Sequence, residues 1–558
     1  MRSYIKGIIT GIIIGTMICS LPLNAGALKN REYKYDTATE FSGGSGSADD
    51  PYLISTWGEM SLVNEYGCGE DGKNVHFKVT ADLTEHETVI SEEENTFTEI
   101  ISEPIGSEDK PFEGIFDGDN HIVYSGIYNG NTFLTHTLFG VIGESGEVRN
   151  LSYCHVAGVN RGLIENCITN SDTLSHVGHV GGIADENSGT IRCCKTTFTG
   201  AYQRASYIYG EVYGREHGIG GICGLNDGGL IEECYSSTSV FGLDENNVAV
   251  GGIVGDNTDG IVRNCASEAR ISNYGKETGG IAGRLDGGTL ENCYAVPSIG
   301  ITSYRYTGGL VGAVYNDYKI ISCYSAESRK YPVIGNAKIE EAEYGYTTEQ
   351  LKQKSLYENW DFKNVWAFNS FDYPAVRGLF TFPDTLTHWG RESVQFAAER
   401  GYVSGYEDGT FRPDGLVTKA EFIHMALGDP ECNQHMLYTD IPEWADACVR
   451  KAYSMGLLEH IDNSETELGA NEPITRIEAA NIAGKISVYT QNISFTDLDE
   501  VPDWAIAGLK SSVNHKFMKG YEDGTFRPNN TLTRAEAAAI VSKGVRETFE
   551  FYLNTEQW

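Results

Sequence analysis

Three cationic side chains occupy the same place in three related segments, and they are the residues whose type and spacing best suit binding chemistry. Lys419, Arg476 and Arg534 each follow a threonine that stands three residues before a glutamate, in Thr418-x-x-Glu421, Thr475-x-x-Glu478 and Thr533-x-x-Glu536. This spacing is typical of a capping box, which opens an α-helix. A cation at the first helical position opposes the partial positive charge of the helix N-terminus, so its recurrence asks for a reason.

Two explanations fit the recurrent cations. Backbone N–H groups, the helix dipole and a cation together form a binding site for an anion. Alternatively, each cation pairs with an acid of a neighbouring unit, such as Asp384 or Asp497. The spacing alone does not choose between these explanations.

Each of the three segments also has one tryptophan at a fixed place, Trp389, Trp444 or Trp504. An indole ring can stack on a sugar, or it can pack in the core. One tryptophan per repeat favours the core. The capping glutamates need no role beyond the helix start.

Elsewhere, the residue types that could catalyse a reaction are sparse. Asp117, Asp119 and His121 are the nearest approach to a cluster, but they lie in a glycine-rich turn, and turn formation is the better interpretation. Asp227, Asp259 and Asp286 also recur at turns. The sequence shows no serine–histidine–aspartate elbow, phosphate loop or zinc-ligand spacing, and the vicinal pair Cys193–Cys194 is weak evidence for a metal. We therefore predict no catalytic residue, metal or cofactor.

The cations belong to helical units that repeat. The nine residues Gly405-Tyr-Glu-Asp-Gly-Thr-Phe-Arg-Pro413 recur letter for letter at Gly520 to Pro528, and a divergent copy lacking this turn lies between them. Each unit starts with an aromatic-x-Asp element, then has the tryptophan and a first amphipathic helix, with Gly401 and Gly456 placed as C-caps. In the last unit Ile506, Leu509, Val513 and Phe517 have the spacing of one buried helical face.

This pattern resembles the S-layer homology (SLH) triplet, whose Thr-Arg-Ala-Glu motif is complete at 533–536. The resemblance implies an all-α triplet with a pseudo-threefold arrangement, whose grooves bind pyruvylated secondary wall polysaccharide. Matching residues to the family motif assigns the polysaccharide contacts to Lys419, Arg476, Arg534, Trp389, Trp444, Trp504, Gly405 and Gly520. Because the middle unit lacks the nine-residue turn, its groove is in doubt.

The middle of the chain predicts a different architecture. Two glycines, an aliphatic residue and a small or apolar residue recur from 181 to 312, and a glycine five residues before a cysteine follows at Cys194, Cys234, Cys265 and Cys293. Short alternating runs between glycine turns indicate strands, and repeats this short bury a core only by stacking. The phrases resemble the GLUG repeat, which implies a right-handed parallel β-helix. The recurrent cysteines then form a ladder of small buried groups, which we expect to be reduced.

Composition and the N-terminus bound the remaining possibilities. The formal charge of −36, from 78 acidic and 42 basic residues, argues against nucleic acid or an anionic membrane as the main partner. The first residues have the layout of a secretory signal, with a retained membrane anchor as the alternative; Cys19 lacks a lipobox context. We divide the chain into a signal peptide (1–27), a short linker (28–42), a β-helix with lead-in and closing segments (43–376), SLH units at 377–428, 429–490 (divergent) and 491–546, and a tail (547–558).

We therefore expect a multidomain, secreted cell-surface protein that is anchored non-covalently to an anionic, pyruvylated wall polysaccharide of a Gram-positive-type, anaerobic bacterium. The β-helix is expected to have a structural or adhesive role, with self-assembly or a host or glycan ligand as its possible partners. The alternative is a wall-anchored polysaccharide lyase or glycoside hydrolase with its active site on the β-helix.

Overall fold

The computed structural model describes residues 38–545 apart from 84–87, 91–96, 100–103, 124–125, 130–131, 136, 153–154, 170–172, 176–177, 198–206, 211–216, 243–247, 302–305, 327–330, 338–344, 369–371, 400–401, 407, 429–431, 433–434 and 486–491. The expected signal peptide, the C-terminal tail and the expected C-cap Gly401 lie outside the described residues. Among the residues described, no helix is both long and apolar enough to cross a bilayer.

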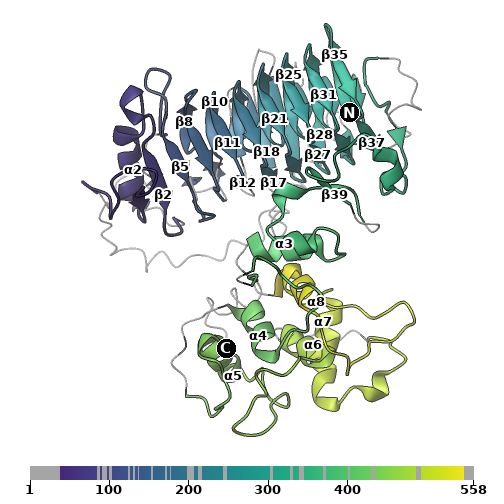
Figure 1. Cartoon of the computed structure of the whole chain (residues 1–558). Coiled ribbons are helices and arrows are strands. Elements are labelled where there is room, and N and C mark those ends of the chain that lie inside the picture. The colour runs from purple at the N-terminus through teal and green to yellow at the C-terminus, as the bar shows by residue number, and fades with distance from the viewer. Residues whose placement is uncertain are drawn as a thin grey trace.

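The first two thirds of the chain form a β-solenoid of about seven turns, as the glycine repeats predict (Figure 1). Sheet 1 contains β1 (Tyr52–Ile54), β2 (His76–Val79), β5 (Ile115–Asp117), β9 (Glu147–Arg149), β11 (Leu163–Glu165), β16 (Thr190–Arg192), β21 (Leu230–Glu232), β26 (Ile261–Arg263), β31 (Thr289–Glu291) and β36 (Lys319–Ile321). Sheet 2 contains β8 (Phe139–Ile142), β10 (Ala157–Asn160), β15 (Ala184–Asn187), β20 (Cys223–Asp227), β25 (Val254–Thr258), β30 (Ala282–Asp286) and β35 (Val311–Tyr315).

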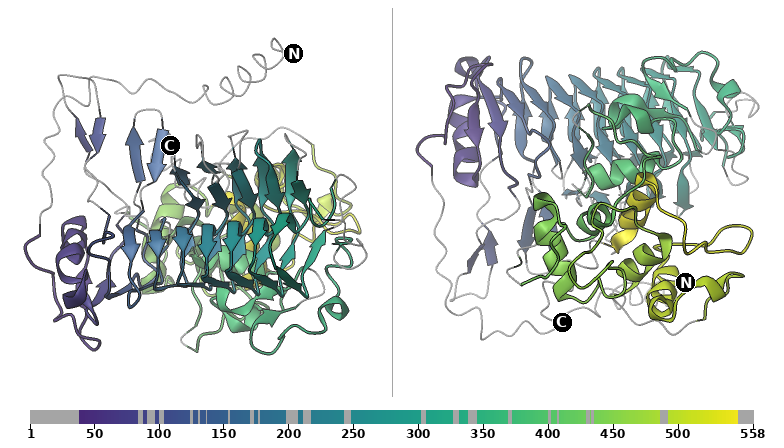
Figure 2. Two further views of the ribbon diagram at one scale, coloured as in Figure 1. Left: turned by 90° about the horizontal axis from the view of Figure 1, so that it is seen from above. Right: turned by 60° about the horizontal axis from the view of Figure 1, so that its bottom comes forward.

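Three further sheets complete the coils. Sheet 3 contains β12 (Ile168–Thr169), β17 (Lys195–Thr196), β22 (Tyr235–Ser236), β27 (Ala266–Ser267), β32 (Tyr294–Ala295), β37 (Tyr324–Ala326) and β38 (Gly345–Tyr346). Sheet 4 contains β13 (Thr173–Ser175), β18 (Tyr207–Gly210), β23 (Ser239–Gly242), β28 (Arg270–Asn273) and β33 (Ser298–Ile301), and sheet 5 contains β14 (Val180–Gly181), β19 (His217–Gly220), β24 (Val248–Gly251), β29 (Glu277–Gly279) and β34 (Tyr306–Gly308). The neighbouring strands of these sheets are parallel and come from successive coils (Figure 2).

Smaller elements flank the solenoid. Helix α2 (Trp57–Tyr66) begins at a capping box between Thr56 and Glu59, and a 3₁₀ turn η1 (Glu70–Gly72) follows it. Antiparallel pairs join β3 (Thr88–Ile90) to β4 (Phe97–Glu99), β6 (Gly126–Asn129) to β7 (Thr132–Thr135), and β39 (Trp366–Ala367) to β40 (Ala375–Val376). The closing segment, defined here as residues 345–381, also holds the 3₁₀ turns η3 (Lys354–Tyr357) and η4 (Arg377–Leu379).

The paired glycines are explained by close approach between coils. A Cβ on Gly221 would lie 2.2 Å from the carbonyl oxygen of Gly252 and 2.2 Å from the Ser236 hydroxyl. Because no side chain fits in that space, glycine is required where the chain bends between sheets 5 and 2.

The cysteine ladder lies inside the solenoid. Cys167, Cys194, Cys234, Cys265, Cys293 and Cys323 are fully buried, and none of these six forms a disulfide. Each follows a corner residue with a left-handed backbone, and Cys193 (φ 51°) is one of these corner residues. The vicinal pair Cys193–Cys194 is therefore explained by a corner residue followed by a core residue.

A second ladder, of asparagines, lies inside the same coils. Asn160, Asn187, Asn226 and Asn257 are buried on sheet 2. The Nδ2 of each of the first three donates to the Oδ1 of the next at 2.7 Å, and Asn257 donates to the carbonyl of Gly260. These side-chain hydrogen bonds pair buried amide groups of successive coils and thereby help to fix the alignment of each coil on the next.

The last third contains short helices that lie alongside the solenoid (Figures 1 and 2). They are α3 (Arg391–Glu399), α4 (Lys419–Leu427), α5 (Asp446–Ser454), α6 (Arg476–Gly484), α7 (Ile506–Asn514) and α8 (Arg534–Ile540), with 3₁₀ turns η5 (Pro383–Thr385), η6 (Glu443–Ala445), η7 (Leu498–Glu500) and η8 (Asp503–Ala505) and a π-helical turn η9 (Val541–Val545). Leu509 and Phe517 of the predicted apolar face are buried. Gly456 has φ 65° just after α5, as expected of a C-cap.

Three equivalent residues, one from each unit, close a hydrogen-bonded ring at the centre of this region. Val417 N donates to Leu532 O, Leu532 N to Ile474 O, and Ile474 N to Val417 O, at 3.0–3.1 Å. All three side chains are fully buried. The cyclic order is what a pseudo-threefold arrangement of the units requires.

Candidate functional site

The three predicted capping boxes are present and set the starts of α4, α6 and α8. Thr418, Thr475 and Thr533 each accept a hydrogen bond from the backbone of the glutamate three residues later, and that glutamate accepts one from the threonine backbone. Lys419, Arg476 and Arg534 are consequently the first residue of each helix, as the spacing predicts.

These cations are buried, although a binding role at an open helix start requires exposure. Lys419 is 4% exposed, Arg476 is 6% exposed and Arg534 is 7% exposed. The adjacent helix-start amides are also engaged, since Arg534 N donates to Gly415 O and Ala535 N to Pro413 O. The helix starts are therefore closed to solvent, because each cationic side chain reaches across to the neighbouring unit.

Arg534, in the third unit, holds the turn of the first unit. Its Nε donates to the Phe411 carbonyl at 3.0 Å, its Nη2 donates to the Ser404 carbonyl at 3.0 Å, and its Nη1 pairs with Glu421 at 3.1 Å. Arg476, in the second unit, holds the third unit in the same way, since Nε donates to Phe526 O and Nη2 to Lys519 O.

Lys419 completes the cycle by reaching from the first unit into the second. Its Nζ donates to the carbonyls of Ile461 (2.8 Å) and Leu468 (3.2 Å) and lies 3.5 Å from Glu478 and 3.8 Å from Glu472. The divergent turn of the middle unit therefore faces Lys419. The middle unit lacks the nine-residue turn. This difference from the family pattern therefore affects the junction between the first and second units.

The acids suggested as ion-pair partners have another task. Asp384 accepts hydrogen bonds from the backbone of Phe411 and Arg412, and Asp497 does the same for Phe526 and Arg527. These carboxylates hold the repeated turns. The observed ion pairs of the cations instead involve Glu421, Glu472 and Glu478.

Two layered stacks rise from the buried arginines to the surface. The Tyr406 ring contacts the guanidinium groups of both Arg534 (4.9 Å) and Arg412 (3.9 Å), the distances being measured to the ring centroid. The Tyr521 ring likewise contacts both Arg476 (4.7 Å) and Arg527 (4.0 Å). The outer arginines are accessible, with Arg412 and Arg527 side chains 54% and 44% exposed.

Each outer arginine is oriented by its own turn. Arg412 pairs with Asp408 at 3.0 Å and Arg527 with Asp523 at 2.7 Å. Hydrogen bonds from Thr410 and Arg412 lower the pKa of Asp408 to about 2, and the equivalent bonds lower the pKa of Asp523. Sequence reasoning missed the outer arginines and the tyrosines, although all of them lie in the repeated nine-residue segment.

The glycines of this segment serve packing. A Cβ on Gly405 would lie 2.4 Å from a ring carbon of Phe382, and one on Gly520 would lie 2.3 Å from the equivalent atom of Phe495. Each glycine therefore lets the turn rest directly on the aromatic residue that starts its unit.

The tryptophans are not equivalent. Trp389 and Trp444 are 49% and 51% exposed, so the expectation of core packing is wrong for these two. Trp504 is partly buried against the helical core and stacks on His460. About half of the surface of each of these two residues is therefore open to solvent.

The candidate acids of the solenoid are engaged in turns. Asp117 accepts from the Asp119 backbone and from Asn150, Asp119 (φ 48°) pairs with Lys78, and His121 contacts Asp82. These contacts agree with turn formation. Among the described residues, no cluster of three His, Cys, Asp or Glu side chains has the geometry of a metal site.

Comparison with known families agrees with these repeats. The S-layer homology domain matches residues 381–423 and 494–538. The chain carries S-layer homology domains. The two matches fall on the first and third units, which are the units with the nine-residue turn, and the GLUG motif matches residues 246–272 in the solenoid.

Several curated proteins are similar over this region. The exoglucanase XynX of Acetivibrio thermocellus is 29% identical over 30% of this chain and 16% of its own length. The cellulosome-anchoring protein of the same species is 24% identical over 30% of this chain and 26% of its own, and S-layer protein sap of Bacillus anthracis is 27% identical over 30% and 22%. The chain thus spans about a quarter or less of each relative's length, and the matches cover the SLH region alone.

Proposed function

We propose that the SLH region holds this protein at the cell surface by binding an anionic, pyruvylated secondary wall polysaccharide, while the solenoid is displayed in a structural or adhesive role. The observation that carries the proposal is the pair of layered stacks in the SLH-matched units, because each ends in an exposed arginine. A guanidinium can make a bidentate contact with a carboxylate such as that of a pyruvyl ketal.

In this proposal the predicted site residues have two tasks. Lys419, Arg476 and Arg534 are positioning residues that hold the turns and, through Tyr406 and Tyr521, support the outer arginines. Trp389 and Trp444 contact sugar rings from their exposed faces, and Trp504, Gly405 and Gly520 shape the surface beside them. Among the residues that the structure describes, no arginine–tyrosine stack is found at the junction around Lys419, so we propose that this junction contributes least.

The relatives support this assignment through their names. One is a cellulosome-anchoring protein and another is an S-layer protein, and both match this chain over its SLH region. We infer the same surface location here, in the cell wall or S-layer of a Gram-positive-type bacterium. We propose the same domain limits as the sequence indicates, with the solenoid at 43–376 and the anchor at 377–546.

Binding to purified cell walls tests the assignment. Arg412→Ala and Arg527→Ala should each lower affinity by about ten- to hundredfold, because a hydrogen bond to a charged group contributes about 1.5–3 kcal/mol. Arg450→Ala is the matched control, since Arg450 also pairs with an aspartate four residues away but lies outside the stacks. Co-sedimentation before and after chemical removal of the wall polysaccharide measures this, and equal binding by the double variant and wild type contradicts the proposal.

We propose further that the solenoid is not an enzyme, because its best acid cluster is engaged in turn contacts. The exoglucanase among the relatives shares only the SLH region and so gives no support for hydrolysis. Incubation with acidic polysaccharides and wall glycans should release no reducing ends. Turnover lost on Asp117→Asn or Asp119→Asn would instead establish the lyase or hydrolase alternative.

A further inference from the structure

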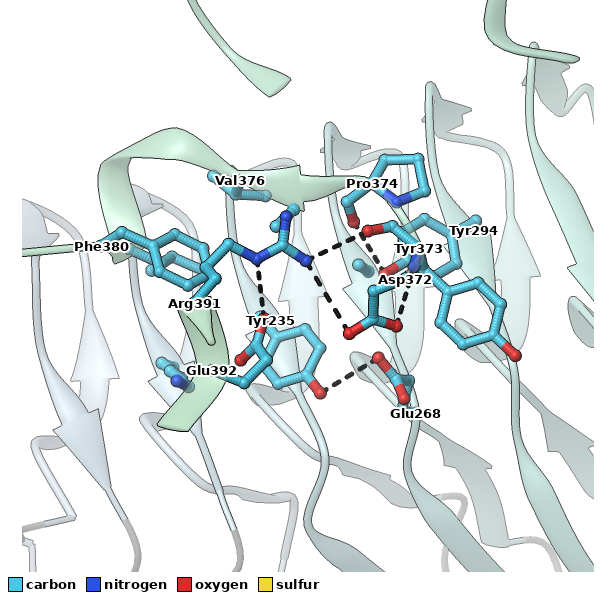
Figure 3. Close-up of a pocket in the computed structure, with 14 residues that line it drawn as sticks. Tyr235, Glu268, Tyr294, Asp372, Tyr373, Pro374, Val376, Phe380, Arg391 and Glu392 are labelled. Carbon is cyan, nitrogen blue, oxygen red and sulfur yellow. Dashed lines mark hydrogen bonds and ion pairs between the residues drawn. The ribbon is translucent and has the colours of Figure 1, made fainter. Parts of the chain in front are cut away.

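The solenoid and the first SLH unit meet at a cluster of ionisable side chains. A cavity of about 20 Å³ lies between the outer face of sheet 3, the closing segment and the start of α3, and it is lined in part by Tyr235, Glu268, Asp372, Arg391 and Glu392 (Figure 3). Three carboxylates and one guanidinium from three different elements therefore converge on a space that holds about one water molecule.

Arg391 is the fixed positive charge at this junction. Its side chain is 2% exposed. The guanidinium pairs with Glu392 at 3.1 Å, lies 4.0 Å from Asp372, donates to the Tyr373 carbonyl at 3.2 Å and lies over the Phe380 ring. It thus ties the first helix of the SLH region to the closing segment of the solenoid.

Among the carboxylates drawn in Figure 3, Glu268 is the one that has no dashed contact with Arg391. It follows strand β27 on the solenoid and accepts a hydrogen bond from the Tyr235 hydroxyl at 3.2 Å. Burial, and then the negative charges of Asp372 and Glu392, raise the pKa of Glu268 from 4.5 to about 7. The Tyr235 hydrogen bond and the positive charge of Lys352 act in the opposite direction.

Two tyrosines and two lysines also face the cluster. The Tyr294 hydroxyl donates to the Pro374 carbonyl at 2.9 Å, and burial raises the pKa of Tyr294 and of Tyr235. Lys195 lies 5.7 Å from the Tyr235 ring centroid, and Lys352 lies over the Tyr373 ring. Burial and like charges thus raise the pKa of Glu268 into the neutral range, to about 7.

We propose that this junction is a proton-controlled latch, which docks the solenoid on its wall anchor when Glu268 is protonated and loosens when Glu268 is ionised. Docking brings the carboxylate of Glu392, on α3, up to Glu268 on the solenoid. Ionised Glu268 then stands buried between two like charges, whereas in the undocked protein water solvates it and α3 carries Glu392 away.

The direction of the pH effect follows from the raised pKa. The docked state binds the proton more tightly than the undocked state, so docking is strongest below pH 4.5 and weakens as the pH rises towards about 7. Each pKa unit by which docking raises the Glu268 value corresponds to about a tenfold change in the docking equilibrium between these limits. The solenoid is thus held against the SLH region at acidic pH and can move relative to it at neutral pH.

Hydrogen exchange of the full chain tests the latch. The Thr381 amide donates to Gln395 of α3 at 2.7 Å and reports docking. After correction for the intrinsic exchange rate, its protection in the wild type should fall at least tenfold from pH 5 to pH 8. Protection of Ile281 in the solenoid core should stay constant, because its amide bonds to Leu310 within sheet-forming coils.

Three variants and one control separate the latch from a general pH effect. Glu268→Gln should keep the acid level of protection throughout, Tyr235→Phe should move the midpoint to higher pH, and Glu392→Gln should move it to lower pH. The control is Glu291→Gln on sheet 1, which should leave the wild-type profile unchanged. A flat wild-type profile, parallel loss at Ile281, or shifts of the same sign for Tyr235→Phe and Glu392→Gln would overturn the proposal.

Discussion

At the scale of single residues, the fold uses its recurrent cations to join neighbouring units. Arg534 satisfies two backbone carbonyls and one carboxylate of another unit while its guanidinium lies against the Tyr406 and Phe411 rings. Burial of a charge is tolerated when such partners are present. Helix capping and cation placement are local and could be predicted, whereas the reach of each side chain into the next unit depends on the packing of the units.

Arg534→Ala should therefore destabilise the SLH region rather than only weaken its binding. The change removes the guanidinium group that the Phe411 and Ser404 carbonyls and Glu421 share, at a cost of about 3–5 kcal/mol. Arg412→Ala, on the exposed end of the same stack, should change the free energy of unfolding by less than about 1 kcal/mol. Thermal and urea melts of the two variants compare these costs, and equal melts would show that the buried contacts contribute little.

At the scale of elements, the solenoid could be predicted because its signals are local. Glycines mark the close bends, and the cysteine spacing marks one buried column. The asparagine ladder could not be predicted in the same way. A polar residue in a strand is ordinarily assigned to the outer face, and only the stacking of Asn160, Asn187, Asn226 and Asn257 allows them to face inwards.

Asn226→Ala should lower the free energy of unfolding of the solenoid, because it breaks the asparagine ladder. The Nδ2 of Asn187 and the Oδ1 of Asn257 would each lose a buried partner, and each loss costs about 1–3 kcal/mol. Thr289→Ala, on the outer face of sheet 1, is the control and should have little effect. Urea unfolding followed by far-ultraviolet circular dichroism distinguishes them; similar midpoints would mean that water replaces the missing amide.

The cysteine ladder leads to a chemical prediction. Cys234, Cys265, Cys293 and Cys323 are fully buried and unpaired, so their thiols should resist alkylation in the native protein and react once it is unfolded. Mass spectrometry after alkylation with and without denaturant counts these thiols. Stable disulfides among the four would contradict the packing role.

Charged side chains on the outer face of the solenoid form a pattern that appears only when successive strands are compared. Along sheet 1 the paired positions Asp117, Arg149, Glu165, Arg192, Glu232, Arg263 and Glu291 alternate in sign from coil to coil. Ion pairs join Arg149 to Asp117, Arg192 to Glu165 and Arg263 to Glu232. Like charges in adjacent rungs would be unfavourable, so the alternation helps to select the correct register.

At the scale of the whole molecule, the strong negative charge opposes the wall binding that we propose. The chain carries a formal charge of −36, so an anionic polymer is repelled at long range although it meets Arg412 and Arg527 at contact.

The Debye length falls from about 30 Å at 0.01 M salt to about 8 Å at 0.15 M, which screens the distant charges first. Raising the salt over this interval should therefore increase the association rate with purified wall polysaccharide, by roughly tenfold. The dissociation rate should rise only modestly, because the contacts are short. Surface plasmon resonance on immobilised polysaccharide measures both rates, and polymer stripped of its anionic groups is the control, for which association should be nearly independent of salt. An association rate that falls with salt would instead mean that the exposed arginines attract the polymer from a distance despite the net charge.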